Sequence, residues 1–112
     1  MESQKSDDTN FLLAVDLAGA RPVVRLCGDV DMATSPVVKN TLSDLLDGGH
    51  LAVVVDLSEV TFMDSSGLHV LVDTHRRLLE SGGQVVLRKP GPIVDKLLQI
   101  SGLAPVFPKE ES

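Results

Sequence analysis

The fold is decided by residues 61–68, which read Thr61-Phe62-Met63-Asp64-Ser65-Ser66-Gly67-Leu68. They follow the apolar run 51–57, which is rich in β-branched residues and too short to form a helix of its own. We therefore predict a buried strand over 51–57. The eight residues 61–68 then mark the point where the chain leaves this strand.

A helix is predicted over roughly 66–80, directly after this stretch. Its apolar residues recur at the spacing of one buried helix face, and its charged residues lie opposite. The apolar set is Leu68, Leu71, Val72, Leu78 and Leu79, and the charged set is Asp73, Arg76, Arg77 and Glu80. Asp64, Ser65 and Ser66 thus lie at a strand-to-helix junction, where a side-chain oxygen caps free N–H groups and the helix dipole favours an anion.

The remaining pattern predicts a single α/β domain over 11–108, between a flexible segment 1–10 and a short tail 109–112. Two strands, 11–17 and 22–28, are close enough to form an antiparallel hairpin. Later elements alternate between helix and strand, so we expect a mixed sheet with parallel neighbours after the hairpin. These elements are a helix from Ser35-Pro36 to Gly48-Gly49, a strand over 84–88, a helix from Ile93 to Ser101-Gly102 and an edge strand over 104–108.

Composition argues against several functional classes. The chain has 112 residues, a formal net charge of −6, three Phe and neither Trp nor Tyr. Clustered cations and stacking aromatics, the usual devices for binding nucleic acid, are therefore lacking. The lone Cys27 excludes an internal disulfide, and we expect it to be a small apolar residue in a strand. With no signal-like or membrane-spanning stretch, we expect a cytoplasmic protein without a membrane partner.

Catalysis by the chain itself has little support in the sequence. His69 follows Ser65 by one helical turn, but the Gly-x-Ser-x-Gly pattern of a hydrolase nucleophile is missing. His75 falls on the apolar stripe and is expected in the core or at its rim. Asp29 and Asp31 form no recognisable metal-binding frame, so we read them as loop or capping residues. We expect no metal, no cofactor and no enzymatic activity.

In its central and flanking motifs the chain resembles the anti-sigma factor antagonists, which belong to the STAS domain class. The resemblance covers roughly residues 10–108 in the family's order and spacing. Its most specific part is Phe62-Met63-Asp64-Ser65-Ser66-Gly67-Leu68. Supporting matches are the preceding run 53–61, the loop Gly28-Asp29-Val30-Asp31 with Thr34 or Ser35, Gly82-Gly83 and Ser101-Gly102-Leu103.

This resemblance implies a small mixed sheet with helices packed mainly on one side, and a partner switch. In such proteins the serine after the Asp, here Ser65, is phosphorylated by an anti-sigma factor that is itself a serine kinase. The unphosphorylated form binds the kinase and frees a sigma factor, and a phosphatase resets the phosphorylated form. The chain departs from the family at His69, where Gly is usual, which bears on how closely a partner approaches this helix.

We therefore predict a docking surface around Ser65, in which Asp64 orients the Ser65 hydroxyl and Ser66 supports the helix start. The other predicted contact residues are Asp29, Asp31, Gly67, His69, Asp73 and Arg76, with Arg77 beside them. Two alternatives remain open. One is a non-switching STAS module of a sensor, transporter or lipid-transport complex, and the other is a serine hydrolase.

Overall fold

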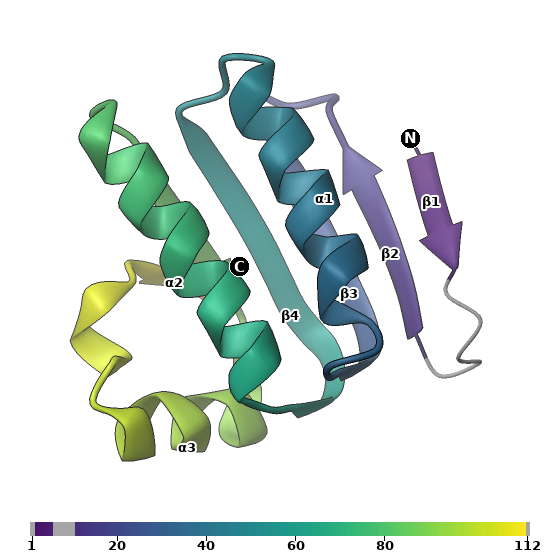
Figure 1. Cartoon of the computed structure of the whole chain (residues 1–112), viewed down its shortest axis with the longest axis vertical. Helices are drawn as coiled ribbons and strands as arrows, with labels where there is room; N and C mark the ends of the chain where they lie inside the picture. The colour runs from purple at the N-terminus through teal and green to yellow at the C-terminus, as the bar shows by residue number, and fades with distance from the viewer. Residues whose placement is uncertain (1, 6–10, 112) are drawn as a thin grey trace.

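The computed structural model describes residues 2–5 and 11–111, which form one six-stranded sheet and three α-helices (Figure 1). The strands lie side by side in the order of the sequence. They are β1 (Glu2–Lys5), β2 (Phe11–Asp16), β3 (Val23–Val30), β4 (Ala52–Met63), β5 (Gln84–Arg88) and β6 (Lys109–Glu110). The helices are α1 (Ser35–Asp47), α2 (Ser65–Glu80) and α3 (Gly91–Ser101), and a 3₁₀ turn covers Ala104–Val106.

The topology confirms the predicted mixed α/β sheet. Strands β2 and β3 pair antiparallel, whereas β3–β4, β4–β5 and β5–β6 pair parallel. Each parallel step is bridged by a helix, as parallel neighbours require. Figure 1 shows α1 and α2 side by side across the sheet, with α3 below them. No helix of the described ranges 2–5 and 11–111 is long and apolar enough to cross a membrane.

The core fills the space between the helices and one face of the sheet. Aliphatic side chains dominate it, as expected for a chain with three aromatic residues. The strands contribute Leu13, Val24, Leu26, Val53, Val55 and Leu87, and the helices contribute Val38, Leu42, Leu68, Leu71, Val94 and Leu98. Burial of these side chains holds the helices on the sheet, at roughly 1.5–3 kcal/mol for each one removed from water.

Strand β4 is longer than predicted. Its apolar part was expected to end at residue 57, but the strand continues to Met63 because β3 stays paired with it. The pairing shifts register twice, between Arg25 and Cys27 and between Gly28 and Asp29. These irregularities break the alternation of side chains, so the sequence pattern for residues 58–63 resembled a loop.

Both ends of the chain add to the sheet. The expected edge strand over 104–108 was wrong, because residues 104–106 form the 3₁₀ turn and the pairing with β5 falls on Lys109–Glu110 of the predicted tail. Residues 2–5 pair with β2 as β1, although 1–10 were expected to be flexible. Residues 1 and 6–10 lie outside the described residues. Helix α1 begins at Ser35, as predicted, and Thr34 is its N-cap residue.

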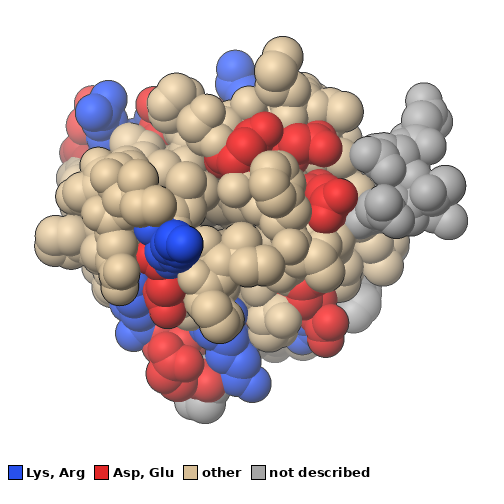
Figure 2. All heavy atoms as spheres, turned by 90° about the horizontal axis from the view of Figure 1, so that it is seen from below, with Lys and Arg blue, Asp and Glu red and all other residues tan. Residues whose placement is uncertain are grey.

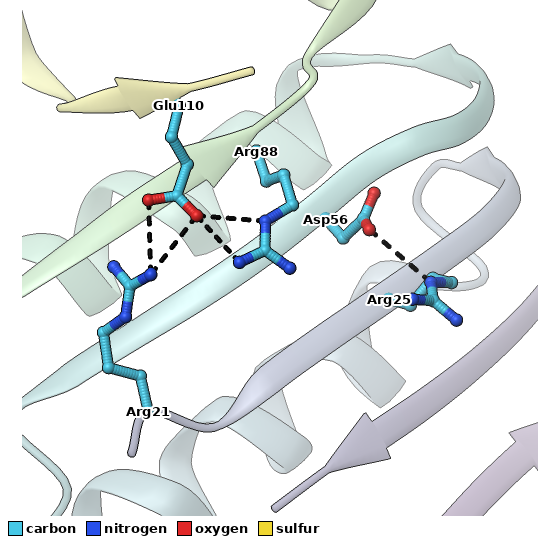
Figure 3. Close-up of polar contacts among 5 residues, drawn as sticks. All are labelled: Arg21, Arg25, Asp56, Arg88 and Glu110. Atoms are coloured by element: carbon cyan, nitrogen blue, oxygen red, sulfur yellow. Dashed lines mark hydrogen bonds and ion pairs between the residues drawn. The ribbon is translucent and has the colours of Figure 1, made fainter. Parts of the chain in front are cut away.

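The sheet face without helices carries a row of alternating charges (Figure 3). Arg25, Asp56, Arg88 and Glu110 are register partners on four successive strands. Arg88 donates two hydrogen bonds, of 2.8 and 3.0 Å, to one Glu110 oxygen, and Arg21 reaches the same carboxylate at 3.3 Å. These bonds, those from Arg88 first, hold the pKa of Glu110 below its usual range. The last strand is thereby tied to the hairpin at the start of the domain.

Asp56 is buried in this row, and burial by itself would oppose its ionisation. Ser58 donates to its Oδ1 from both the backbone N–H, at 2.9 Å, and the hydroxyl, at 2.7 Å. With the Arg25 guanidinium 3.5 Å from its Oδ2, these bonds outweigh the burial, and the pKa of Asp56 lies below its usual range. The carboxylate is therefore kept charged inside the sheet face.

Two neighbouring glycines after α2 give a direct test of the entry to β5. A Cβ on Gly83 would lie 2.8 Å from the Leu51 carbonyl carbon and would overlap its oxygen, whereas a Cβ on Gly82 meets nothing within 4 Å. Gly82 has φ +81°, so Gly82→Ala should cost only about 1–2 kcal/mol. Gly83→Ala should cost about 3 kcal/mol or more of unfolding free energy in urea titrations. Equal losses in the two variants would contradict this packing.

His75 lies in the core as predicted, 4% exposed, and it accepts a 3.0 Å hydrogen bond from the Val85 N–H at Nδ1. Burial lowers the pKa of His75 below 6.5, and a hydrogen bond with the Val106 backbone opposes this only in part. As pH falls below about 6.5, the unfolded chain therefore binds this proton first and stability decreases.

We expect urea titrations to show this loss as pH falls from about 7.5 to below 6.5. The lowered pKa values of Asp56 and Glu110 act in a more acidic range, below about pH 5. The variant His75→Gln should be less stable throughout but should lack this slope. A slope that survives unchanged in His75→Gln would assign it to another group.

Candidate functional site

Asp64 joins the end of β4 to the start of α2. Its backbone is extended, with φ −108° and ψ −172°, and its Oδ1 accepts a 2.8 Å hydrogen bond from the Ser66 N–H. Its own N–H donates to the Val30 carbonyl at 3.1 Å, and its carbonyl accepts from the Leu68 N–H at 3.2 Å. Asp64 is therefore the N-cap of α2 and also extends the contact between β3 and β4.

Ser65 and Ser66 differ in their surroundings. Ser65, the first helical residue, is exposed, whereas Ser66 is half-buried and uses its N–H in the cap. Among the described residues, no histidine or carboxylate forms a hydrogen bond with the Ser65 hydroxyl. The predicted orientation of this hydroxyl by Asp64 thus stays a prediction. Ser65 is thus an exposed residue at a helix N-terminus, and within 2–5 and 11–111 no activating base is bonded to its hydroxyl.

The loop between β3 and α1 lies beside this junction and is held by hydrogen bonds. The Asp31 carboxylate accepts from the Ala33 N–H at 2.9 Å and from the Thr34 N–H at 3.1 Å. The fully buried Thr34 hydroxyl donates to the Asp29 carbonyl at 2.8 Å and accepts from the Asp31 N–H at 2.9 Å. Asp29 accepts a 2.8 Å bond from the Thr61 hydroxyl. Asp31 thus has the loop role predicted from the sequence. Asp29 does not, because it lies within β3 and its carboxylate binds a side chain of the neighbouring strand β4.

Gly67 allows α2 to approach β3. It is buried, and a Cβ at this position would lie 2.7 Å from Val30 Cγ1 and 3.1 Å from Met63 Cγ. Any larger residue would push the first turn of α2 away from the sheet. Gly67 therefore shapes the predicted docking surface from beneath, by packing.

The other predicted contact residues lie along the exposed side of α2. His69 and Asp73 line a cavity of about 500 Å³ between α1 and α2, together with Lys39, Ser43, Val70, Thr74 and Arg77. Arg77, which also lines this cavity, connects α2 to α1. It donates a 3.2 Å hydrogen bond to the Ser43 hydroxyl and forms a 3.6 Å ion pair with Asp47. Arg76 is exposed two turns after His69, on the same stripe of the helix.

The predicted residues thus form two neighbouring groups. Asp29, Asp31, Asp64, Ser65 and Ser66 meet at the carboxyl ends of β3 and β4, and His69, Asp73 and Arg76 lie along α2. Figure 2 views the molecule from the end where α2 begins, and acidic side chains gather there among uncharged ones. Within residues 2–5 and 11–111, no group of three or more His, Cys, Asp or Glu is placed to hold a metal ion.

Two exposed apolar residues, Met32 and Phe62, lie on this end, and the sequence pattern did not indicate their exposure. Met32 follows Asp31 in the β3–α1 loop and is 78% exposed, and Phe62 is 48% exposed and is the register partner of Asp29. Met32 lies in a loop and Phe62 in the irregular end of β4, and neither belongs to a periodic pattern from which exposure could be predicted. Cys27, in contrast, lies half-buried in β3 as expected, where burial and the nearby Glu59 charge raise the pKa of its thiol.

The mixed sheet, its one-sided helices and the Asp-Ser-Ser-Gly helix start define a STAS domain. The family model described as "Mlab, STAS domain" matches residues 13–108. The chain is 32% identical over 87 residues to the anti-sigma F factor antagonist of Paenibacillus polymyxa, which covers 77% of this chain and 74% of that protein. The chain belongs to the STAS-domain family of anti-sigma factor antagonists.

Solved structures agree with this assignment. An anti-sigma factor antagonist from Mycobacterium paratuberculosis is 29% identical and has a TM-score of 0.80, with 96% of this chain and 92% of that chain covered. Bacillus SpoIIAA shares the fold at 24% identity, with TM-scores of 0.76 for its unphosphorylated and 0.72 for its phosphorylated form. Each comparison with SpoIIAA covers 89% of this chain and 89% or 92% of the SpoIIAA chain.

The cap can be tested by changing Asp64. Asp64→Ala removes the acceptor for the Ser66 N–H and should lower the free energy of unfolding by about 0.5–2 kcal/mol in urea titrations. Asp64→Ser retains a capping oxygen and should recover most of this loss. Asp73→Ala, which changes an exposed acid on the same helix, should stay within about 0.5 kcal/mol of wild type. A loss at Asp73 equal to that at Asp64 would contradict the capping role.

Proposed function

We propose that this chain binds an anti-sigma factor that is a serine kinase, thereby releases a sigma factor, and is inactivated by phosphorylation of Ser65. The observation that carries the proposal is the placement of Ser65. Its hydroxyl is exposed at the first position of α2, directly after the capping Asp64, on a domain of the antagonist family. In this role the chain is a substrate and a binding partner, not an enzyme, and it acts in the cytoplasm.

The fold has physical reasons to tolerate phosphate at this position. A phosphoserine carries about −1.5 to −2 charges and three acceptor oxygens, and a helix N-terminus offers N–H groups and a favourable dipole. The neighbouring Asp64, Asp29 and Asp31 oppose it with like charge, but all three residues are partly exposed to water at the carboxyl ends of β3 and β4. That Bacillus SpoIIAA keeps this fold in its phosphorylated form supports the same conclusion.

The phosphate would therefore act on the partner. A kinase that reaches the Ser65 hydroxyl must cover the surrounding surface, and a phosphate left in that interface adds charge that must be desolvated. A loss of about 2.7 kcal/mol weakens binding about a hundredfold. That change is large enough to move the kinase from this chain to its sigma factor. A phosphatase that removes the phosphate would complete the cycle.

Ser65→Ala and Ser66→Ala form a matched pair for the test. The wild-type chain is incubated with ATP and each candidate anti-sigma kinase, and the peptide spanning Thr61 to Arg76 is examined by mass spectrometry. We expect one added phosphate on the wild type and on Ser66→Ala, and none on Ser65→Ala. Continued labelling of Ser65→Ala would move the modified position to Ser66.

The alternative function, a non-switching STAS module, makes the opposite prediction. No candidate kinase would then label the wild-type chain, whether or not it binds. The absence of genes for a serine kinase and a sigma factor near the gene for this chain would point the same way. Turnover of an ester that disappears in Ser65→Ala would instead identify a hydrolase.

A further inference from the structure

Met32 and Phe62 expose apolar surface on the same end of the molecule as Ser65. Phe62 pairs with Asp29 near the end of β4, three residues before Ser65, and Met32 lies in the loop that follows β3. Their exposed fractions are 78% for Met32 and 48% for Phe62, and neither belongs to the core described above. Single exposed apolar residues are common on proteins, so the two need a reason beyond exposure.

The first reason is that the backbone beneath Met32 is fixed. The Asp31 carboxylate and the buried Thr34 hydroxyl hold the loop on both sides of it with the bonds described above. The Asp29 and Thr61 side chains, joined at 2.8 Å, brace the strand ends beside Phe62. A side chain presented by an ordered backbone loses less entropy on binding than one on a mobile loop.

The second reason is the setting of the pair. Acidic side chains gather on this end of the molecule among uncharged surface (Figure 2). Asp29, Asp31 and Asp64 come from the same two strand ends as Met32 and Phe62. Apolar anchors within a charged rim are the usual arrangement of a protein-binding surface, where a few large side chains supply most of the affinity.

We propose that Met32 and Phe62 are the anchor residues through which the anti-sigma kinase binds this chain, and that they determine which kinase recognises it. The partner would present an apolar pocket for the two side chains and a basic rim opposite the three carboxylates. This inference rests on the proposed function. A kinase whose active site meets Ser65 must also cover the strand ends that carry Met32 and Phe62.

The test compares Met32→Gln, Phe62→Gln and the double variant with wild type. The probe is the candidate anti-sigma kinase that phosphorylates wild type most efficiently, and the readouts are its Kd for each variant and kcat/KM for Ser65 phosphorylation. We expect each single change to weaken both about tenfold or more. Met32→Leu, which keeps the apolar surface, should stay close to wild type.

Leu79→Gln is the matched control. Leu79 is 57% exposed in the last turn of α2, at the opposite end of the helix from Ser65. The Leu79→Gln variant should have a Kd for the kinase and a kcat/KM for Ser65 phosphorylation within about twofold of wild type. This difference is far below the tenfold expected for the Met32 and Phe62 variants. Thermal unfolding of the three single Gln variants should stay near that of wild type, since all three side chains are exposed.

If Met32→Gln and Phe62→Gln bind the kinase as tightly as wild type, the two residues are not its anchors. The proposal that Ser65 is phosphorylated would be unaffected by that result. An equal loss of affinity in Leu79→Gln would also contradict the anchor role, because the effect would then not be restricted to the end of the molecule that carries Ser65. If no candidate kinase phosphorylates or binds the wild-type chain, the proposed function itself fails, and the inference falls with it.

Discussion

Three hydrogen bonds of one residue, Asp64, determine how strand β4 passes into helix α2 beside Ser65. Its N–H binds the Val30 carbonyl at the end of β3, its carbonyl receives the Leu68 N–H, and its carboxylate receives the Ser66 N–H. One residue thus fixes where β4 stops, where α2 starts and how both meet β3. Because these bonds involve the residues on either side of Ser65, its backbone is held while its side chain remains exposed.

The helix-free face of the sheet and the carboxyl ends of β3 and β4 differ in how their charged side chains are paired. On the face opposite the helices, the charged side chains pair with one another. Glu110 binds Arg88 and Arg21, and Asp56 binds Ser58 and Arg25. The carboxyl ends of β3 and β4 instead leave acidic and apolar side chains toward solvent. A partner that binds at these strand ends would meet a backbone that is already held by hydrogen bonds. A change of charge at Ser65 could therefore alter binding without altering the fold.

Much of the fold could be predicted from the sequence, because in most elements the spacing of apolar residues agrees with the Gly, Pro and capping residues at the ends. Strand β5, helix α2 and the burial of His75 follow directly from spacing. The extension of β4 to Met63 was missed because two register shifts break its alternation, and β6 was missed because two residues are too few to form a pattern. The exposure of Met32 depends on how the Asp31 loop folds back on Thr34, and the exposure of Phe62 depends on the shifted register of β4 beside β3. Residue type reveals neither.

In the proposed switch, phosphate on Ser65 changes binding without changing the fold. The most direct measurement is calorimetric titration of the anti-sigma kinase with the unphosphorylated chain and with the same chain phosphorylated at Ser65, alongside thermal unfolding of both. We expect binding about a hundredfold weaker for the phosphorylated chain, which corresponds to about 2.7 kcal/mol, and a native fold in both. Equal affinities, or a phosphorylated chain that has lost its cooperative unfolding, would contradict the proposed switch.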